Sequence, residues 1–103
     1  MGDIQFTASF LDQVDEYIKG LPVPEQGLIA AHITELELGN FQSVLTKKLR
    51  GPIRELIVRH HRLIYFTVGK KLYFASGFRK KSRKTPKKEI DYAEKIYTMI
   101  KQN

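Results

Sequence analysis

The spacing of apolar residues changes partway along the chain, and this change restricts the folds that the sequence can adopt. In the first part, apolar residues recur every three or four positions, as at Phe10, Val14 and Tyr17, which is the spacing of an amphipathic helix. Between residues 53 and 78, short runs rich in β-branched and aromatic residues are typical of strands. The sequence therefore predicts an α+β fold.

A short strand and two helices are expected before the change. Residues 3–6 are expected to form the strand, and a helix should start at Thr7 or Ser9 and end at Gly20. A second helix, with Pro24 in its first turn, should end at a Gly-Asn pair. The two helices are expected to pack as an antiparallel hairpin with their acidic side chains on the outer faces.

Three strands are expected after the change, at residues 53–59, 62–68 and 72–78. Lys47 and Lys48 are expected in the loop before them, and a Gly-Lys hairpin turn should join the second strand to the third. In the middle strand, alternate residues should face opposite sides of the sheet. One of these faces is expected to pack on the helices and the other to be partly open.

A last helix is expected at the C-terminus, where Thr85 precedes Pro86 as a cap and an apolar stripe follows. Residues 1–103 are then expected to form one domain, because the length suits a single core. The predicted order is β-α-α-β-β-β-α. In this fold an antiparallel sheet is packed by an N-terminal helical hairpin and by the C-terminal helix.

Charge is divided unevenly between the two parts of the chain. The net charge is +7, but residues 1–46 contain seven acidic residues and one lysine, whereas residues 47–103 contain 17 basic and four acidic residues. A strongly basic half on a small domain indicates a polyanionic partner, and nucleic acid is the most common one. The alternative is that this charge only keeps the surface soluble.

Several classes of site are excluded or unsupported by composition. The chain has no cysteine and three histidines, which excludes disulfides and thiolate metal sites and gives no support for a zinc site or another cofactor. No apolar run approaches the roughly 20 residues that span a bilayer. The start of the chain, Met1-Gly2-Asp3-Ile4, lacks a basic region and an apolar signal core, so we expect a cytosolic protein.

The strongest basic cluster lies just before the expected last helix, where residues 79–88 contain seven basic residues and no acidic one. We expect this run to contact phosphates, with backbone amides at the helix start adding to the site. The alternative is a solvated loop. The candidate ligands within it are Arg79, Lys80, Lys81, Arg83 and Lys84.

Two further clusters extend the candidate site. Lys47, Lys48 and Arg50 would extend the basic face, and Arg59 and Arg62 flank two histidines between expected strands. Arg62 begins a strand of otherwise hydrophobic residues, so we expect it either to reach an oxyanion or phosphate or to pair with Glu55 across the strands. His61 is a candidate general acid or base, because the histidine pKa lies near neutrality. The alternative is that both histidines are ordinary turn residues.

The reaction class is narrowed by missing motifs. The sequence has no glycine-rich phosphate loop, no serine-hydrolase elbow and no histidine motif of metalloproteases. If the chain is an enzyme, basic side chains and a histidine must carry the chemistry. Metal-free RNA cleavage fits this requirement, because the 2′-hydroxyl is a built-in nucleophile that the protein has only to align and assist.

Several segments also carry a resemblance to a known family, namely residues 48–50, 53–59, 62–66, 77–82 and 84–93. The most specific part is Gly-Phe-Arg-Lys-Lys at 77–81 followed by Lys-Thr-Pro at 84–86. These segments resemble the RelE/HigB superfamily of toxins from type II toxin–antitoxin systems, especially its phage-derived branch. The order of the expected elements is also similar to the RelE-like fold.

The resemblance implies a microbial toxin that cleaves mRNA, often inside the ribosomal A site, without a cofactor. It implies neutralisation by an antitoxin, commonly a helix-turn-helix protein of the HigA type. Operator DNA would then be bound only through the toxin–antitoxin complex, which would repress its own operon.

The resemblance also implies roles for individual residues. By position, Arg62 corresponds to a strand arginine that contacts the scissile phosphate, and Lys80, with Arg79 beside it, falls near a second basic residue. Lys48 falls near the loop lysines of the family. Tyr97 is the only well-placed candidate for the tyrosine or histidine that, near the C-terminus of several members, orients or protonates the site.

Two other functions fit the same sequence. Relatives resembling ParE share the fold but poison DNA gyrase, and a non-toxic co-repressor would only bind nucleic acid. DNA damage with intact mRNA would indicate the first. Binding with a steep salt dependence but without cleavage would indicate the second.

Overall fold

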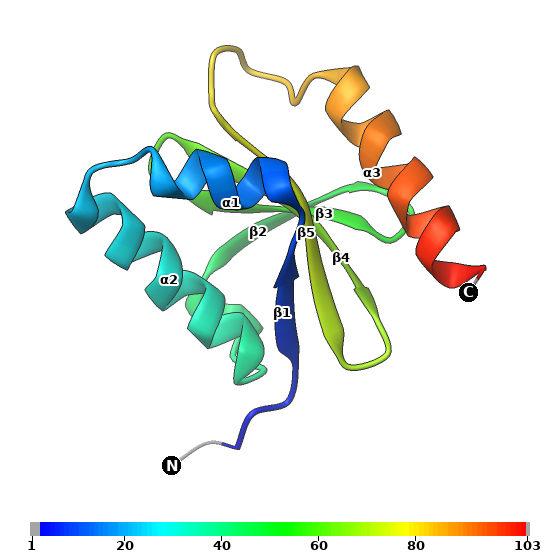
Figure 1. Ribbon diagram of the computed structural model, residues 1–103, viewed down its shortest axis with the longest axis horizontal. Coiled ribbons are helices and arrows are strands. Elements are labelled where there is room, and N and C mark those ends of the chain that lie inside the picture. The colour runs from blue at the N-terminus through cyan, green and yellow to red at the C-terminus, as the bar shows by residue number, and fades with distance from the viewer. Residues whose placement is uncertain (1–2, 103) are drawn as a thin grey trace.

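Helices cover both faces of one β-sheet in the computed structural model, which describes residues 3–102 (Figure 1). Met1 and Gly2, on which the expectation of no signal peptide partly rests, lie outside the described residues, as does Asn103. The predicted α+β fold is confirmed. Its elements are β1 (Thr7–Phe10), α1 (Asp12–Lys19), α2 (Val23–Glu37), a short 3-10 helix (Phe41–Ser43), β2 (Leu45–Arg50), β3 (Ile53–Val58), β4 (His61–Val68), β5 (Lys71–Arg79) and α3 (Lys87–Lys101).

The five strands are arranged in the order β1-β5-β4-β3-β2. Strands β2 to β5 are paired antiparallel in chain order, which confirms the predicted meander. The predicted hairpin turn is Gly69-Lys70, where Gly69 has a φ of +60° that favours glycine. The sheet is not wholly antiparallel as predicted, since the edge strand β1 runs parallel to β5.

Two apolar clusters hold the layers together, because alternate strand residues point to opposite faces. Helices α1 and α2 cover one face, where Ile29 and Leu36 pack with Leu63 and Phe74. Helix α3 covers part of the other face, where Ala93 packs with Ile64 and Phe66. Figure 1 shows α1 and α2 on one side of the strands and α3 on the other.

The predicted boundaries at the N-terminus are wrong. Residues 3–6 are not a strand, because the backbone amides of Gln5 and Phe6 donate to the carbonyl of Glu37, at 2.8 and 2.9 Å. Pairing with β5 starts only at Thr7, and α1 starts at Asp12 rather than at Thr7 or Ser9. The sequence misled because Phe10 continues the helical spacing, although it lies in β1 and stacks on the buried ring of Phe74.

The expected loop at Lys47 and Lys48 is also wrong, because both residues lie in strand β2. This strand is the second edge of the sheet, and it pairs Lys47 with Glu55 and Lys48 with Arg54. Lysine is common on edge strands, where its charge discourages pairing with another chain. The two lysines therefore made this edge strand look like a loop in the sequence.

The acidic side chains of the helical hairpin are only partly on the outside. Asp12, Asp15 and Glu16 are exposed, as expected. Glu37 instead accepts a hydrogen bond from the backbone amide of Ala8, at 2.9 Å, and Glu25 contacts a buried histidine described below.

Among residues 3–102, no helix is long and apolar enough to cross a membrane.

Candidate nucleic-acid interface

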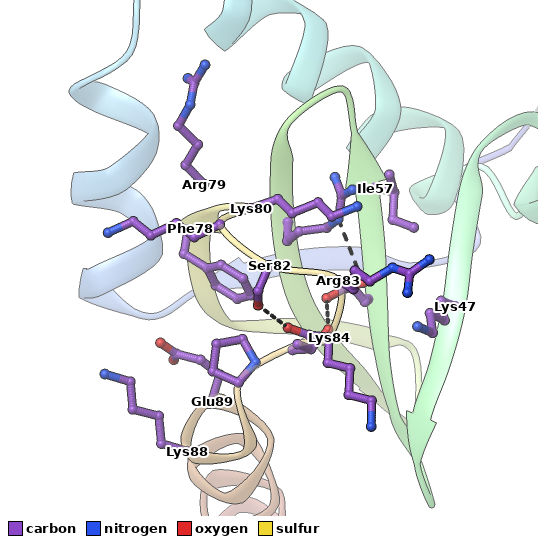
Figure 2. Close-up of a pocket in the computed structure, with 15 residues that line it drawn as sticks. Lys47, Ile57, Phe78, Arg79, Lys80, Ser82, Arg83, Lys84, Lys88 and Glu89 are labelled. Atoms are coloured by element: carbon purple, nitrogen blue, oxygen red, sulfur yellow. Dashed lines mark hydrogen bonds and ion pairs between the residues drawn. The ribbon is translucent and has the colours of Figure 1, made fainter.

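Helix α3 leaves one end of its sheet face uncovered, and a cavity of about 250 Å³ lies there (Figure 2). Strands β2 to β5, the loop 80–86 and the start of α3 surround it. Fifteen residues line this cavity, called the basic cavity below. They include eight cationic side chains and two carboxylates: Lys47, Arg62, Arg79, Lys80, Lys81, Arg83, Lys84 and Lys88, with Glu55 and Glu89.

Strand register brings the floor of the basic cavity together. Lys47 is paired with Glu55 across β2 and β3, and Arg62 is paired with Ile57 on one side and Phe78 on the other. Paired residues on neighbouring strands point to the same face. Residues that are far apart in the sequence therefore share this floor.

Arg62 lies on the floor with its guanidinium already oriented. Its side chain is only 12% exposed, and its Nη1 donates to the carbonyls of Arg59 and His61, at 2.7 and 2.9 Å. Its Nε lies 3.9 Å from a carboxylate oxygen of Glu55. Within residues 3–102, Nη2 makes no hydrogen bond. This leaves donors with which Arg62 can bind an anion in the basic cavity.

Glu55 is a buried carboxylate at the centre of this cationic site. It is 3% exposed, and its Oε2 accepts a hydrogen bond of 2.5 Å from the hydroxyl of Thr85. The predicted role of Thr85 as a helix cap is wrong, because Pro86 occupies the cap position and α3 begins at Lys87. The hydroxyl of Thr85 instead attaches the loop 80–86, called the basic loop below, to the floor of the cavity.

Other contacts hold the basic loop at the rim. The amide of Lys80 donates to the carbonyl of His60, at 2.7 Å, and the hydroxyl of Ser82 donates to the carbonyl of Lys84, at 2.9 Å. At the base of α3, the buried Ser76 donates to Glu89, at 2.7 Å. The loop is therefore attached near both of its ends, by the amide of Lys80 and by the hydroxyl of Thr85.

The charge of the basic cavity selects for an anion. The eight cationic residues that border the cavity outnumber its two carboxylates, and a concave surface of one sign focuses its field on a ligand. Phosphate groups suit both the lysine ammonium groups and the planar guanidinium of Arg62. An extended polyanion can reach several of these cations at once.

Most of the predicted ligands line the basic cavity, but Arg79 is placed differently from the others. Arg62, Lys80, Lys81, Arg83, Lys84 and Lys47 line it as cations on its floor or rim. Arg79 borders the cavity, but Figure 2 shows its side chain turned away from Lys47, Arg83 and Lys84. Its partner in the strand register is His61, so Arg79 faces the side of α1 and α2.

Three predicted RNA ligands lie outside the cavity. Lys48 is next to Lys47 on β2, so its side chain faces the opposite side of the sheet. Arg50 forms hydrogen-bonded ion pairs with Asp91 and Glu94 of α3, at 2.8 and 2.6 Å, and so attaches α3 to β2. Arg59 is exposed in the turn between β3 and β4, with a φ of +56°.

The two predicted proton-transfer residues also lie outside the basic cavity. His61 is 1% exposed on the face covered by the helical hairpin, where it bonds to Tyr17 and Glu25, both at 2.6 Å. Tyr97 packs edge-on against Phe66, with ring centroids 5.2 Å apart. Neither side chain lines the cavity, so the structure does not bring them to Arg62.

Sequence reasoning considered Glu55 only as a partner of Arg62 and assigned no site role to Thr85. The signal for Glu55 was a carboxylate in a strand whose other residues are mostly hydrophobic, at Ile53–Val58. A charged residue in such a strand either faces solvent or serves a polar site. No local signal joins Glu55 to Thr85, because they are 30 residues apart in the sequence.

Comparison with known families gives one match. Residues 16–98 match the family described as Phage derived protein Gp49-like (DUF891). This segment includes α2, all four antiparallel strands and most of α3. A comparison with curated proteins finds no match.

Solved structures with a similar fold include an archaeal RelE in its RelE–RelB complex from Pyrococcus horikoshii OT3. It has a TM-score of 0.68 and 16% identity, over 79% of this chain and 100% of the matched chain. The isolated E. coli RelE toxin has a TM-score of 0.56 and 17% identity, over 91% and 98% of the two chains. The intact E. coli RelBE toxin–antitoxin complex gives 0.56 and 17%, over 75% and 99%. At these identities the likeness shows the fold.

Proposed function

Because this chain belongs to the phage-derived Gp49-like family of the RelE superfamily, we propose that it is the toxin of a type II toxin–antitoxin system and acts as an mRNA endoribonuclease. Its fold matches RelE chains that were solved together with an antitoxin. The observation that carries the proposal is the basic cavity, in which Arg62 and the cations of the loop 80–86 surround a space open to a nucleic-acid strand.

In the proposed reaction, the RNA supplies the nucleophile, which is the 2′-hydroxyl beside the scissile phosphate. Glu55, the buried carboxylate 3.9 Å from Arg62, accepts the proton of this hydroxyl as its oxygen attacks phosphorus. Arg62 and Lys80 stabilise the negative charge that develops on the phosphoryl oxygens. The bond to the 5′-oxygen breaks, and a lysine ammonium of the cavity gives this oxygen a proton.

The remaining cations of the cavity are proposed to position the RNA rather than to react with it. Lys47, Lys81, Arg83 and Lys84 border the space around Arg62 and suit phosphates on either side of the scissile bond. The proposed substrate is mRNA in the cytoplasm, read on the ribosome. The proposed partner is an antitoxin, such as a helix-turn-helix protein of the HigA type, and operator DNA is bound only through their complex.

Expression of the chain in bacterial cells without an antitoxin tests this function. We expect growth arrest and shortened mRNAs that carry new 5′-hydroxyl ends, both of which should disappear with Arg62→Ala. The control is Lys95→Ala, which removes an exposed cation of α3 that does not line the cavity. Intact mRNA with broken DNA would contradict the proposal and indicate gyrase poisoning. Normal growth with RNA binding but no cleavage would contradict it in favour of a co-repressor.

A further inference from the structure

The orientation of Arg62 depends on a turn of the backbone. Its Nη1 is held by two carbonyls, that of Arg59 in the connection between β3 and β4 and that of His61, the first residue of β4. If these carbonyls moved, the free part of the guanidinium would point elsewhere. The position of this turn therefore determines where Arg62 presents its remaining donors.

The turn itself has an unfavourable backbone conformation. Arg59 has a φ of +56°, a region that costs a non-glycine residue of this kind about 1 kcal/mol or more. Such a conformation persists only where the surrounding structure enforces it. On the cavity side, the amide of Lys80 binds the carbonyl of His60, at 2.7 Å. The strand pairs Val58–His61 and His61–Arg79 also hold the backbone where the turn ends, and a further anchor comes from a side chain.

That anchor lies on the opposite face of the sheet. The side chain of His61 is buried between α1 and α2, where Nδ1 lies 2.6 Å from the hydroxyl of Tyr17 and Nε2 lies 2.6 Å from Glu25. A neutral ring with its proton on Nε2 satisfies both contacts, because it donates to Glu25 and accepts from Tyr17. Burial raises the pKa of Tyr17, although the nearby Arg79 opposes this, so the phenol keeps the proton it donates.

We infer that His61, held by Tyr17 and Glu25, is a positioning residue for Arg62. The inference rests on the proposed RNA cleavage for its effect on rate, but the placement of Arg62 can be measured without it. The backbone of His61 directly follows the turn as the first residue of β4, and its side chain contacts both helices of the hairpin. It therefore links the covered face of the sheet to the basic cavity, although its own side chain never reaches the substrate.

Two neighbouring histidines provide a matched test. His61→Asn removes the buried anchor, whereas His60→Asn changes an exposed turn residue that makes no side-chain hydrogen bond within residues 3–102. We expect single-turnover cleavage of ribosome-bound mRNA to fall about 10- to 100-fold in His61→Asn, as misplacement of a catalytic group does. Affinity for a non-cleavable RNA, with deoxyribose at the scissile position, should change less than twofold. Equal cleavage rates for the two variants would overturn the inference.

A milder variant and a direct measurement guard against misfolding. Tyr17→Phe removes one hydroxyl from the cluster and should also slow cleavage, with RNA affinity retained. In NMR spectra that resolve arginine side chains, the Arg62 guanidinium of the unaltered chain and of His60→Asn should show slowed hydrogen exchange, and Tyr17→Phe should lose this protection. Protection that survives in Tyr17→Phe and in folded His61→Asn would reject the positioning role. If the unaltered chain cleaves no RNA, the proposed function fails, while the exchange measurement still decides the inference.

Discussion

The two faces of the sheet are built from alternate residues of the same strands, yet they differ in what covers them. The face under α1 and α2 is closed and apolar at its centre, with Leu56, Leu63 and Phe74 fully buried. The other face is closed only where α3 packs on Ile53, Ile64 and Phe66. At its open end the side chains are cations around a buried carboxylate.

This difference indicates how a chain of 103 residues combines a stable core with a charged site. Burial of apolar surface stabilises a fold by about 25 cal/mol per Å², and the closed face and the α3 cluster provide most of it. Cations gathered at the open end repel one another, and that repulsion costs stability. We infer that the closed face sets the stability of the protein and the open end sets its activity.

The largest expected effect is on the closed face. Phe74→Ala should lower the free energy of unfolding by about 3–5 kcal/mol, because it leaves a cavity among tightly packed side chains. Phe74 stacks on Tyr65 and on Phe10, with ring centroids 5.3 and 5.2 Å apart. Urea denaturation measures the loss. Phe78→Ala is the control on the other face of β5, where the ring is only half-buried, and an equal loss there would remove the contrast between the faces.

The next effect is on activity at the open end. Arg62→Ala should reduce RNA cleavage about 10²–10³-fold, because one group that stabilises transition-state charge is lost. Its loss of unfolding free energy should be smaller than that of Phe74→Ala, since Glu55 keeps its bond to Thr85.

The control for Arg62 is Arg54→Ala. Arg54 lies on the opposite face of β3, where its Nη2 donates to Thr46 at 3.0 Å, so cleavage should be retained. Single-turnover rates and urea denaturation check both variants. Similar loss of cleavage in the two variants would show that the face of the sheet does not matter.

Glu55→Gln should reduce cleavage about 100-fold, which is the low end of the usual contribution of a general base. The amide oxygen of glutamine can still accept the bond from Thr85, so the loop should keep its position and RNA affinity should hold. Comparison of the cleavage rate with the affinity for non-cleavable RNA checks this separation. Cleavage that persists in Glu55→Gln would transfer the role of base to another group.

The smallest expected effect concerns the ion pairs that attach α3. Hydrogen bonds from Lys87 and Arg50 lower the pKa of Asp91. Since the pKa is lower in the folded chain than in the unfolded one, the stabilisation is complete well above pH 4 and is lost as the pH falls through the lowered value. Asp91→Asn should therefore slightly lower the thermal midpoint at pH 7, and this difference should shrink as the pH falls through the lowered pKa of Asp91. A difference that stays constant over this range would contradict the linkage.

Much of the fold could be predicted from the sequence, because the composition and spacing of apolar residues are clear in the segments that form the core. The runs that became β3, β4 and β5 are rich in β-branched and aromatic residues, and their boundaries differ by one residue or so from those expected. Strand β2 was missed because its Lys47 and Lys48 are typical of a loop unless the strand is known to be an edge. Strand β1 was missed because Phe10 fits a helical spacing equally well.

The density of basic residues in the sequence indicated which cations form the candidate site, but it did not indicate how their side chains are arranged. Residues 80–84 border the basic cavity because the chain passes there from β5 to α3, an order of elements that the sequence indicated. The pairing of Glu55 with Thr85 depends on the path of the loop across the sheet, and no local pattern encodes it. Because side chains alternate along β4, His61 and Arg62 point to opposite faces of the sheet. The position of His61 outside the cavity could therefore have been predicted from the strand alone.

Two adjacent lysines of β2 provide the most direct test of where RNA binds. Lys47 lines the basic cavity, whereas Lys48 faces the other side of the sheet, so Lys47→Glu and Lys48→Glu change the net charge equally but at different places. The measurement is the affinity for a non-cleavable RNA as a function of salt concentration. If RNA binds in the basic cavity, Lys47→Glu should weaken binding about tenfold and flatten the salt dependence, while Lys48→Glu should change affinity less than twofold. Equal weakening by the two variants would contradict the claim that RNA binds in the basic cavity.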